Sequence, residues 1–184
     1  MTIWTVGHSN RTQAAFLALL AQSGIALVAD VRAFPRSRTN PQFNADVLEA
    51  ALADAGIGYV HLPDLGGRRA SRKDAAGSPN TLWREPGFRN YADYALTPPF
   101  RAGLAELMRL AGERRTVVMC AEAVWWRCHR RLIADYLLAA DVAVMHILSE
   151  DRVEAAALSK GARVADDGRI TYPGPQGDLF APPV

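Results

Sequence analysis

The residues that could do chemistry gather in a few short segments of this 184-residue chain. Its two cysteines, Cys120 and Cys128, flank Glu122, and His129 and Arg130 follow directly. A thiol that faces the start of a helix meets unpaired N–H groups and the positive end of the helix dipole, a setting that binds anions and lowers a thiol pKa. Arginine adds forked donors that match phosphate or carboxylate. This segment therefore predicts an anion site with a reactive thiol.

Similar side chains follow two earlier apolar segments. His8 and Ser9 come after the first of them, and Asp30 and Arg32 come at the end of the second. Each also has a structural interpretation. Ser9 equally suits a helix cap, Asp30 and Arg32 a structural ion pair, and Cys120 a small buried hydrophobe.

Three chemistries fit these residues. A cysteine phosphatase or rhodanese-like enzyme would place Cys120 and Arg127 around a tight loop, but the six residues between them are one more than those families use. A zinc site formed by both cysteines and His129 lacks paired, short-spaced ligands, so we expect no metal. The third chemistry is acid–base catalysis by Asp30 and Glu122 on a substrate held by arginines. The sequence identifies no cofactor.

The elements that must position these residues alternate between apolar runs and helical patterns. Continuous apolar runs are typical of strands in a parallel sheet that is covered on both faces. The expected strands are Ile3–Val6, Ile25–Val31, Ile57–His61, Thr116–Cys120 and Val142–Leu148. The expected helices are Thr12–Ser23, a helix capped by Asn44 and ended by Gly56, Phe88–Ala95, Pro99–Ala111 and Cys128–Ala140.

This repetition predicts a three-layer α/β fold, with a mostly parallel sheet of about five strands flanked by helices. Ligands of such sheets bind outside the carboxyl ends of the strands, where the polar residues fall. The length suits one domain, which we place at residues 1–172, before a flexible Pro/Gly-rich tail at 173–184. Asp166–Gly168 predicts a tight turn.

The composition of the chain bears on its cellular location and on the partners it could bind. No apolar run is long enough to cross a membrane, and the first residues do not resemble a signal peptide. Two cysteines are too few for a disulfide framework, so we expect reduced thiols and a cytoplasmic location. The formal charge is only +2, so contact with nucleic acid would need a local basic patch.

Two segments indicate partners. A basic loop beside the expected pocket could close over a phosphate backbone through Arg68, Arg69, Arg72 and Lys73. The tail resembles the motif by which bacterial DNA polymerases and repair proteins hold the sliding clamp, with Gly177 in place of the usual leucine. Its contact residues would be Gln176, Asp178, Leu179 and Phe180.

Taken together, the segments resemble a known family. They are Thr5–Ser9, Asp30–Arg32 with Pro35 and Ser37, Leu65–Gly67, Cys120–Glu122 and Cys128–Arg130. In this order, from about residue 3 to residue 148, they are similar to the domain of unknown function 488 family. The resemblance implies an α/β fold and one site shared by these segments, with Ser37 among its anion-binding residues beside His8, Ser9, Arg32 and Arg130. It implies no reaction.

We therefore expect an enzyme, or a former enzyme, that acts on nucleic acid or a nucleotide in DNA processing or repair. Its catalytic residues would be Cys120, Glu122, His129 and Asp30. One alternative is a cysteine-dependent enzyme on a small anionic metabolite. The other is a non-catalytic adaptor that binds DNA-processing proteins.

Overall fold

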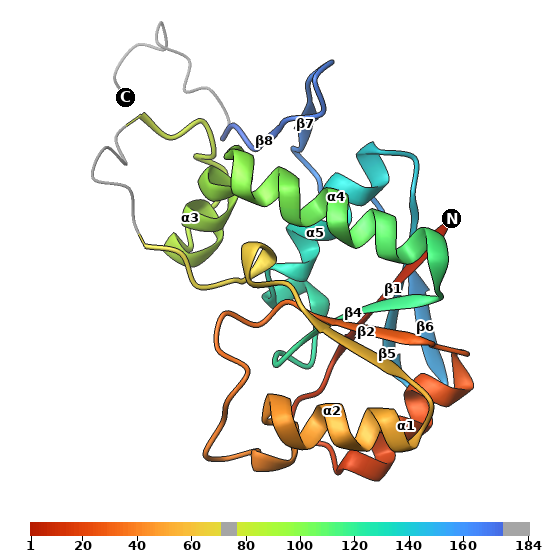
Figure 1. Cartoon of the computed structure of the whole chain (residues 1–184). Coiled ribbons are helices and arrows are strands. Elements are labelled where there is room, and N and C mark those ends of the chain that lie inside the picture. The colour runs from red at the N-terminus through yellow and green to blue at the C-terminus, as the bar shows by residue number, and fades with distance from the viewer. Residues whose placement is uncertain (71–76, 175–184) are drawn as a thin grey trace, which may run out of the picture.

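A computed structural model describes residues 1–70 and 77–174 (Figure 1). The strands are β1 Thr2–Gly7, β2 Leu27–Asp30, β3 Gly58–His61, β4 Thr116–Cys120, β5 Ala143–Ser149, β6 Arg152–Ala155, β7 Arg163–Val164 and β8 Ile170–Thr171. The α-helices are α1 Gln13–Gln22, α2 Ala45–Asp54, α3 Pro86–Ala95, α4 Pro98–Glu113 and α5 Arg130–Ala139. Within the described residues, short 3-10 helices also lie at η1 Pro41–Phe43, η2 Pro63–Leu65 and η4 Trp125–Arg127. None of the helices in these two ranges is long and apolar enough to cross a bilayer.

Six strands form one sheet in the order β3-β2-β4-β1-β5-β6. The first five are parallel, and β6 runs antiparallel to β5. Every residue of β2 and β4 is buried, as expected of apolar runs covered on both faces. The predicted three-layer α/β fold and its five parallel strands are therefore confirmed.

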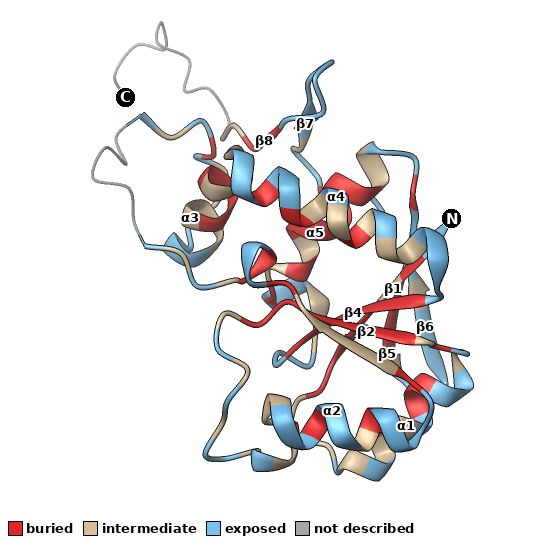
Figure 2. Ribbon diagram, in the orientation of Figure 1, coloured by how far each residue is buried: buried red, intermediate tan, exposed pale blue. Residues whose placement is uncertain are grey.

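The helices divide between the two faces of the sheet (Figure 1). Helices α1 and α2 cover one face, where Phe16 and Leu48 pack with Val117. Helices α3, α4 and α5 cover the other, where Leu107 and Leu132 belong to the second core cluster. Buried residues accordingly concentrate in the central strands and on the inner sides of the helices (Figure 2).

This division creates a change of direction at β4. Strands β1 and β2 lead into helices on one face, whereas β4, which lies between them, leads into α5 on the other face. The loops that leave adjacent strands therefore diverge at their carboxyl ends. Such a switch point leaves a crevice that commonly holds the ligand in open α/β sheets.

Some predicted details differ. Strand β6 was not expected, because it is short and mostly exposed and its sequence lacks an apolar run. Helix α5 begins at Arg130, so Cys128 precedes it in extended conformation. The turn at residues 166–168 is present, between the paired strands β7 and β8.

Candidate active site

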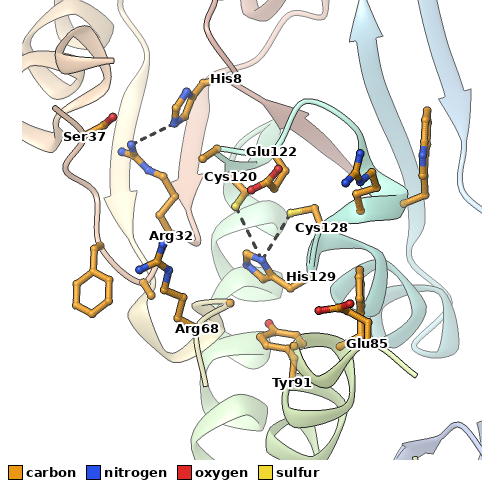
Figure 3. Close-up of a pocket in the computed structure, with 18 of the residues that line it drawn as sticks. His8, Arg32, Ser37, Arg68, Glu85, Tyr91, Cys120, Glu122, Cys128 and His129 are labelled. Carbon is orange, nitrogen blue, oxygen red and sulfur yellow. Dashed lines mark hydrogen bonds between the residues drawn. The ribbon is translucent and has the colours of Figure 1, made fainter. Parts of the chain in front are cut away.

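A cleft of about 760 Å³ opens at the switch point, within the usual size range of ligand pockets (Figure 3). Its residues come from the carboxyl ends of β1, β2 and β4, the start of α5, and α3 with the loop before it. Those expected from the sequence are His8, Arg32, Ser37, Arg68, Cys120, Glu122 and His129.

Gly7 allows the loops after β1 and β4 to meet. A Cβ atom at this position would lie 1.8 Å from the backbone oxygen of Glu122, so no other residue fits. Beyond the strands, the His8 N–H donates to the Cys120 carbonyl and the Ser9 N–H to the Ala121 carbonyl, each at 2.9 Å. The backbone pairing therefore continues past the sheet and fixes His8 beside the thiol loop.

Asp30 and Arg32 form a buried ion pair that shapes one wall. Arg32 donates from Nε to Oδ1 of Asp30 at 2.9 Å, and its backbone N–H donates to the same oxygen at 3.0 Å. The hydroxyl of Tyr59 donates to Oδ2 at 2.8 Å. Burial alone would lower the pKa of Arg32, but the bonds and charge of Asp30 reverse this and raise it. Asp30 is fully buried behind Arg32, so the geometry favours a positioning role over the expected catalytic one.

His8 is held as a neutral ring. Its Nδ1 donates to the Ser9 carbonyl at 2.8 Å, which leaves Nε2 to accept from Nη1 of Arg32 at 3.4 Å. The ring stacks on Phe43 with 4.2 Å between centroids. Burial, opposed by the bond to Ser9, lowers the pKa of His8 to about 4. At neutral pH His8 therefore contributes a polar edge without a charge.

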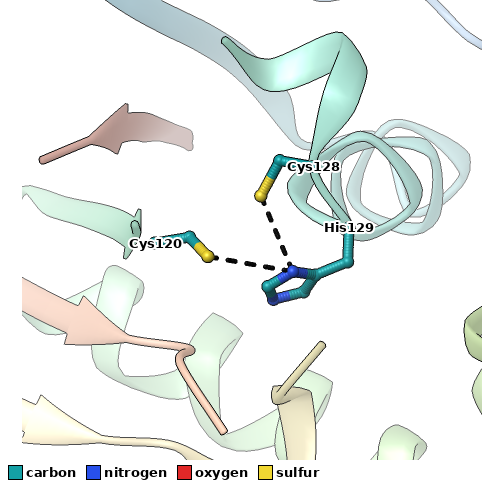
Figure 4. A group of neighbouring side chains, drawn as sticks. All are labelled: Cys120, Cys128 and His129. Carbon is teal, nitrogen blue, oxygen red and sulfur yellow. Dashed lines mark hydrogen bonds between the residues drawn. The ribbon is translucent and has the colours of Figure 1, made fainter. Parts of the chain in front are cut away.

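The floor of the cleft carries the two thiols and one imidazole (Figure 4). Nε2 of His129 donates to the Val31 carbonyl at 3.0 Å, so the proton of the neutral ring is on Nε2. Nδ1 then presents a lone pair toward Cys128 Sγ at 3.6 Å and Cys120 Sγ at 3.9 Å. The three ligand atoms lie within 4.8 Å of one another, which makes them a potential metal-binding group.

Arg130 lies beneath this cluster and is only 1% exposed. Its Nε donates to Cys128 Sγ at 3.3 Å, and its Nη2 donates to the backbone oxygen of Glu122. Burial would raise the pKa of Cys128, but its interactions with the Cys120 thiol, the His129 ring and the Arg130 guanidinium lower it well below its ordinary value. The hydrogen bond to Cys128, together with burial, raises the pKa of Cys120 well above its ordinary value. Without a metal, Cys128 is therefore the more acidic of the two thiols.

A family comparison covers most of these residues. The family model for the domain of unknown function DUF488 matches residues 12–137. The chain belongs to this family. No curated protein and no solved structure matched the chain. The DUF488 match includes Asp30, Arg32 and the whole Cys120–Arg130 segment, whereas His8 lies just before it.

Several residues of this DUF488 domain line the cleft although sequence reasoning did not select them, and three of these belong to one segment. Glu85, Phe88 and Tyr91 come from the start of α3 and the residue before it. Tyr91 donates to the Leu65 carbonyl at 2.8 Å, and its ring centroid lies 5.0 Å from that of His129. The polar stretch that interrupts the strand–helix rhythm before α3 was the available signal, because such an interruption often adds a wall to a site.

Other expected site residues lie elsewhere. Ser9 does not line the cleft, and its hydroxyl donates to Asn10 at 3.3 Å. Arg69 lies over the Tyr94 ring and donates to two backbone carbonyls, so it belongs to the structure of its loop. Arg130 lies behind the cysteines and does not reach the cleft. The remaining expected residues, Arg72, Lys73, Gln176, Asp178, Leu179 and Phe180, lie outside the described residues.

Proposed function

We propose that this DUF488 chain is an enzyme that acts on a nucleotide or a nucleic-acid strand. Arginines would hold the phosphate, and the cluster of Cys120, Cys128 and His129 would be the reactive centre. The observation that carries the proposal is the position of that cluster, on the floor of a cleft whose walls bear both positive charge and exposed aromatic rings.

The charge of the cleft favours an anion. Four arginines line it, at positions 32, 36, 68 and 127, against the two glutamates Glu85 and Glu122. Arg68 and Arg127 are exposed, and the structure shows no carboxylate within 4.0 Å of either among the residues it describes. Their guanidinium groups are free to form the paired hydrogen bonds that phosphate oxygens accept.

Aromatic rings at the rim favour a base over a small inorganic anion. Phe34 is 69% exposed and Trp126 is 42% exposed, which is unusual for large apolar side chains. Both line the cleft. Stacking on an exposed ring stabilises a nucleobase by about 1–3 kcal/mol without selecting its identity. Phosphate contacts and stacking surfaces in one cleft are what a nucleotide needs.

The polar groups near the cluster have roles that follow from their positions. The Cys128 thiolate or a water held at the cluster would supply the nucleophile, and Glu122, exposed at the cleft, would move a proton. Asp30 and His8 would keep Arg32 in place. We retain, as part of this proposal, the role in DNA processing or repair that the sequence led us to expect.

The test is a binding titration with nucleotides, short single-stranded oligonucleotides and the matching unphosphorylated nucleosides at low salt. Arg68→Gln and Arg127→Gln should each weaken nucleotide binding about tenfold, because each removes a charge-assisted hydrogen bond. Arg163→Gln is the matched control, since Arg163 is exposed on β7 and does not line the cleft.

Added salt should weaken binding of the oligonucleotide more than that of the nucleotide, because more phosphates are neutralised. Equal binding of small carboxylates or inorganic phosphate would favour the cysteine-dependent enzyme on a small metabolite. No binding by any of these probes would exclude the proposal and leave the adaptor alternative.

The proposed sliding-clamp contact has its own test. A peptide of residues 172–184 should bind the bacterial clamp with micromolar affinity, as the sequence Gln176–Phe180 predicts. The double substitution Leu179→Ala with Phe180→Ala should remove that binding, because the two apolar side chains would fill the partner's pocket. If neither the peptide nor the full chain binds, the clamp contact is excluded.

A further inference from the structure

Cys120, Cys128 and His129 have the spacing of three corners of a metal tetrahedron. With zinc–sulfur bonds of about 2.3 Å and zinc–nitrogen bonds of about 2.05 Å, neighbouring sulfur and nitrogen ligands lie about 3.6 Å apart. Nδ1 of His129 lies 3.6 Å from one sulfur and 3.9 Å from the other. The side chains converge from the end of β4 and the start of α5 (Figure 4).

Hydrogen bonding alone does not account for this convergence. Nδ1 has a single lone pair in the tautomer fixed by Val31, yet both sulfur atoms lie next to it. Thiol hydrogen bonds are weak, and one acceptor gains little from a second such donor. A cation between the three atoms would use all three lone pairs at once.

The surroundings of the cluster are those of a metal site. Metal-binding histidines usually donate their second ring nitrogen to a carbonyl or carboxylate, as His129 does to the Val31 carbonyl. Arg130 donates to Cys128 Sγ, which orients the thiolate. Gly67 and Tyr91 pack against the imidazole, so the ring has little freedom to turn away. The ligands are thus oriented by their neighbours before any ion arrives.

We infer that Cys120, Cys128 and His129 bind one zinc ion and leave its fourth position open to the cleft. Two thiolates and one imidazole form a ligand set that suits zinc, a borderline-soft cation. In the part of the chain that the structure describes, no fourth histidine, cysteine or carboxylate joins the three. All three residues line the cleft, so the open position faces the substrate space.

The inference departs from the expectation of no metal drawn from the sequence. Seven residues separate the two cysteines, which is not the spacing of a zinc motif. The β4–α5 loop nevertheless returns Cys128 to the end of the strand that holds Cys120. The inference that zinc binds depends on these contacts alone. The further idea that zinc is the reactive centre rests on the proposed function. Bound zinc would supply a polarised water or a contact to an electronegative substrate atom.

The experiment is a titration of the full, reduced, metal-free protein with Zn²⁺ and Co²⁺ in the absence of nucleotide. We expect one ion per chain, with the sulfur-to-cobalt charge-transfer bands and intense visible bands of tetrahedral Co²⁺. Cys120→Ser, Cys128→Ser and His129→Gln should each weaken zinc binding at least tenfold. His61→Gln is the matched control, because His61 lies at the end of the neighbouring strand β3 and donates to the Arg32 carbonyl instead.

A second measurement uses the unaltered protein, in case a variant does not fold. Zinc should protect Cys128, the more acidic thiol, from alkylation by iodoacetamide, and a chelator should restore its reaction. Cobalt spectra without sulfur charge transfer, or zinc binding that survives loss of any one ligand, would overturn the inference. If the protein binds nucleotide but not zinc, the zinc inference is wrong and the proposed function is unaffected. If it binds zinc but not nucleotide, the proposed function is wrong and the zinc inference is unaffected.

Discussion

Gly67→Ala is the substitution that tests most directly how His129 is held. A Cβ atom at position 67 would lie 2.3 Å from Nδ1 of His129, 2.7 Å from Cε1 and 2.8 Å from Cγ. Ordinary contact begins at 3.4 Å, so the imidazole must retreat by about 1 Å. The Tyr91 ring, 5.0 Å from the imidazole between centroids, restricts this movement.

Two costs follow from the displacement. Moving the ring breaks the 3.0 Å hydrogen bond from Nε2 to the Val31 carbonyl, which contributes about 1 kcal/mol. Crowding in a packed region adds about 1–3 kcal/mol. The free energy of unfolding should therefore fall by about 2–4 kcal/mol. Zinc affinity should fall at least tenfold, because metal–ligand distances tolerate changes of only about 0.2 Å.

The assay combines urea denaturation of the metal-free protein with a zinc titration against a competing chelator. Gly87→Ala is the control, because Gly87 lines the same cleft but its added Cβ would meet nothing within 4 Å. This control should keep its stability within about 0.5 kcal/mol and its zinc affinity. If Gly67→Ala matches the wild type in both measurements, the imidazole is not confined as described and the reasoning is refuted.

Three further predictions concern charged groups. In the metal-free protein, the rate of alkylation at Cys128 should inflect below about pH 8.5, because the pKa of this thiol is lowered; a single inflection near 8.5 would contradict this. Asp30→Asn should lower the free energy of unfolding by about 3 kcal/mol in urea denaturation, because it leaves the buried Arg32 charge uncompensated; a loss below 1 kcal/mol would show that water reaches the pair. Acid should destabilise the fold between pH 6.5 and about 4, where the unfolded chain binds a proton that buried His8 does not. His8→Gln should reduce the slope of stability against pH in this window, and an unchanged slope would contradict the burial argument.

The sequence predicted the sheet because its strands are continuous apolar runs. Residues 116–120 show the pattern best, since all five are buried. It also placed His8, Arg32, Cys120 and His129 at one edge, because parallel strands end on the same side. Strand order was beyond one sequence, because every parallel strand has the same apolar pattern. The position of β4 between β1 and β2 depends on hydrogen bonds between strands that are far apart in the sequence.

The roles of individual side chains depended on contacts that spacing does not encode. Arg68 and Arg69 are neighbours in the sequence, yet one lines the cleft and the other lies over Tyr94. Asp30 was expected to be a catalyst, but its oxygens are occupied by Arg32 and a tyrosine hydroxyl. Such differences arise from tertiary packing. Residue type therefore indicates which residues belong to a site better than it indicates the role of each residue there.

Arg130 links the chemical state of the cleft to the survival of the fold. Its guanidinium is almost completely buried, and among the residues in the structure no carboxylate lies within 4.0 Å of it. Its Nε donates to Cys128 Sγ instead, and the lowered pKa of this thiol favours the anionic sulfur as its partner. Alkylation of Cys128, or a disulfide with Cys120, would prevent this sulfur from becoming an anion and leave the buried guanidinium without a negative partner. Modification of Cys128 would therefore destabilise the start of α5. A protein molecule modified at this thiol would unfold and be degraded more readily than an unmodified one.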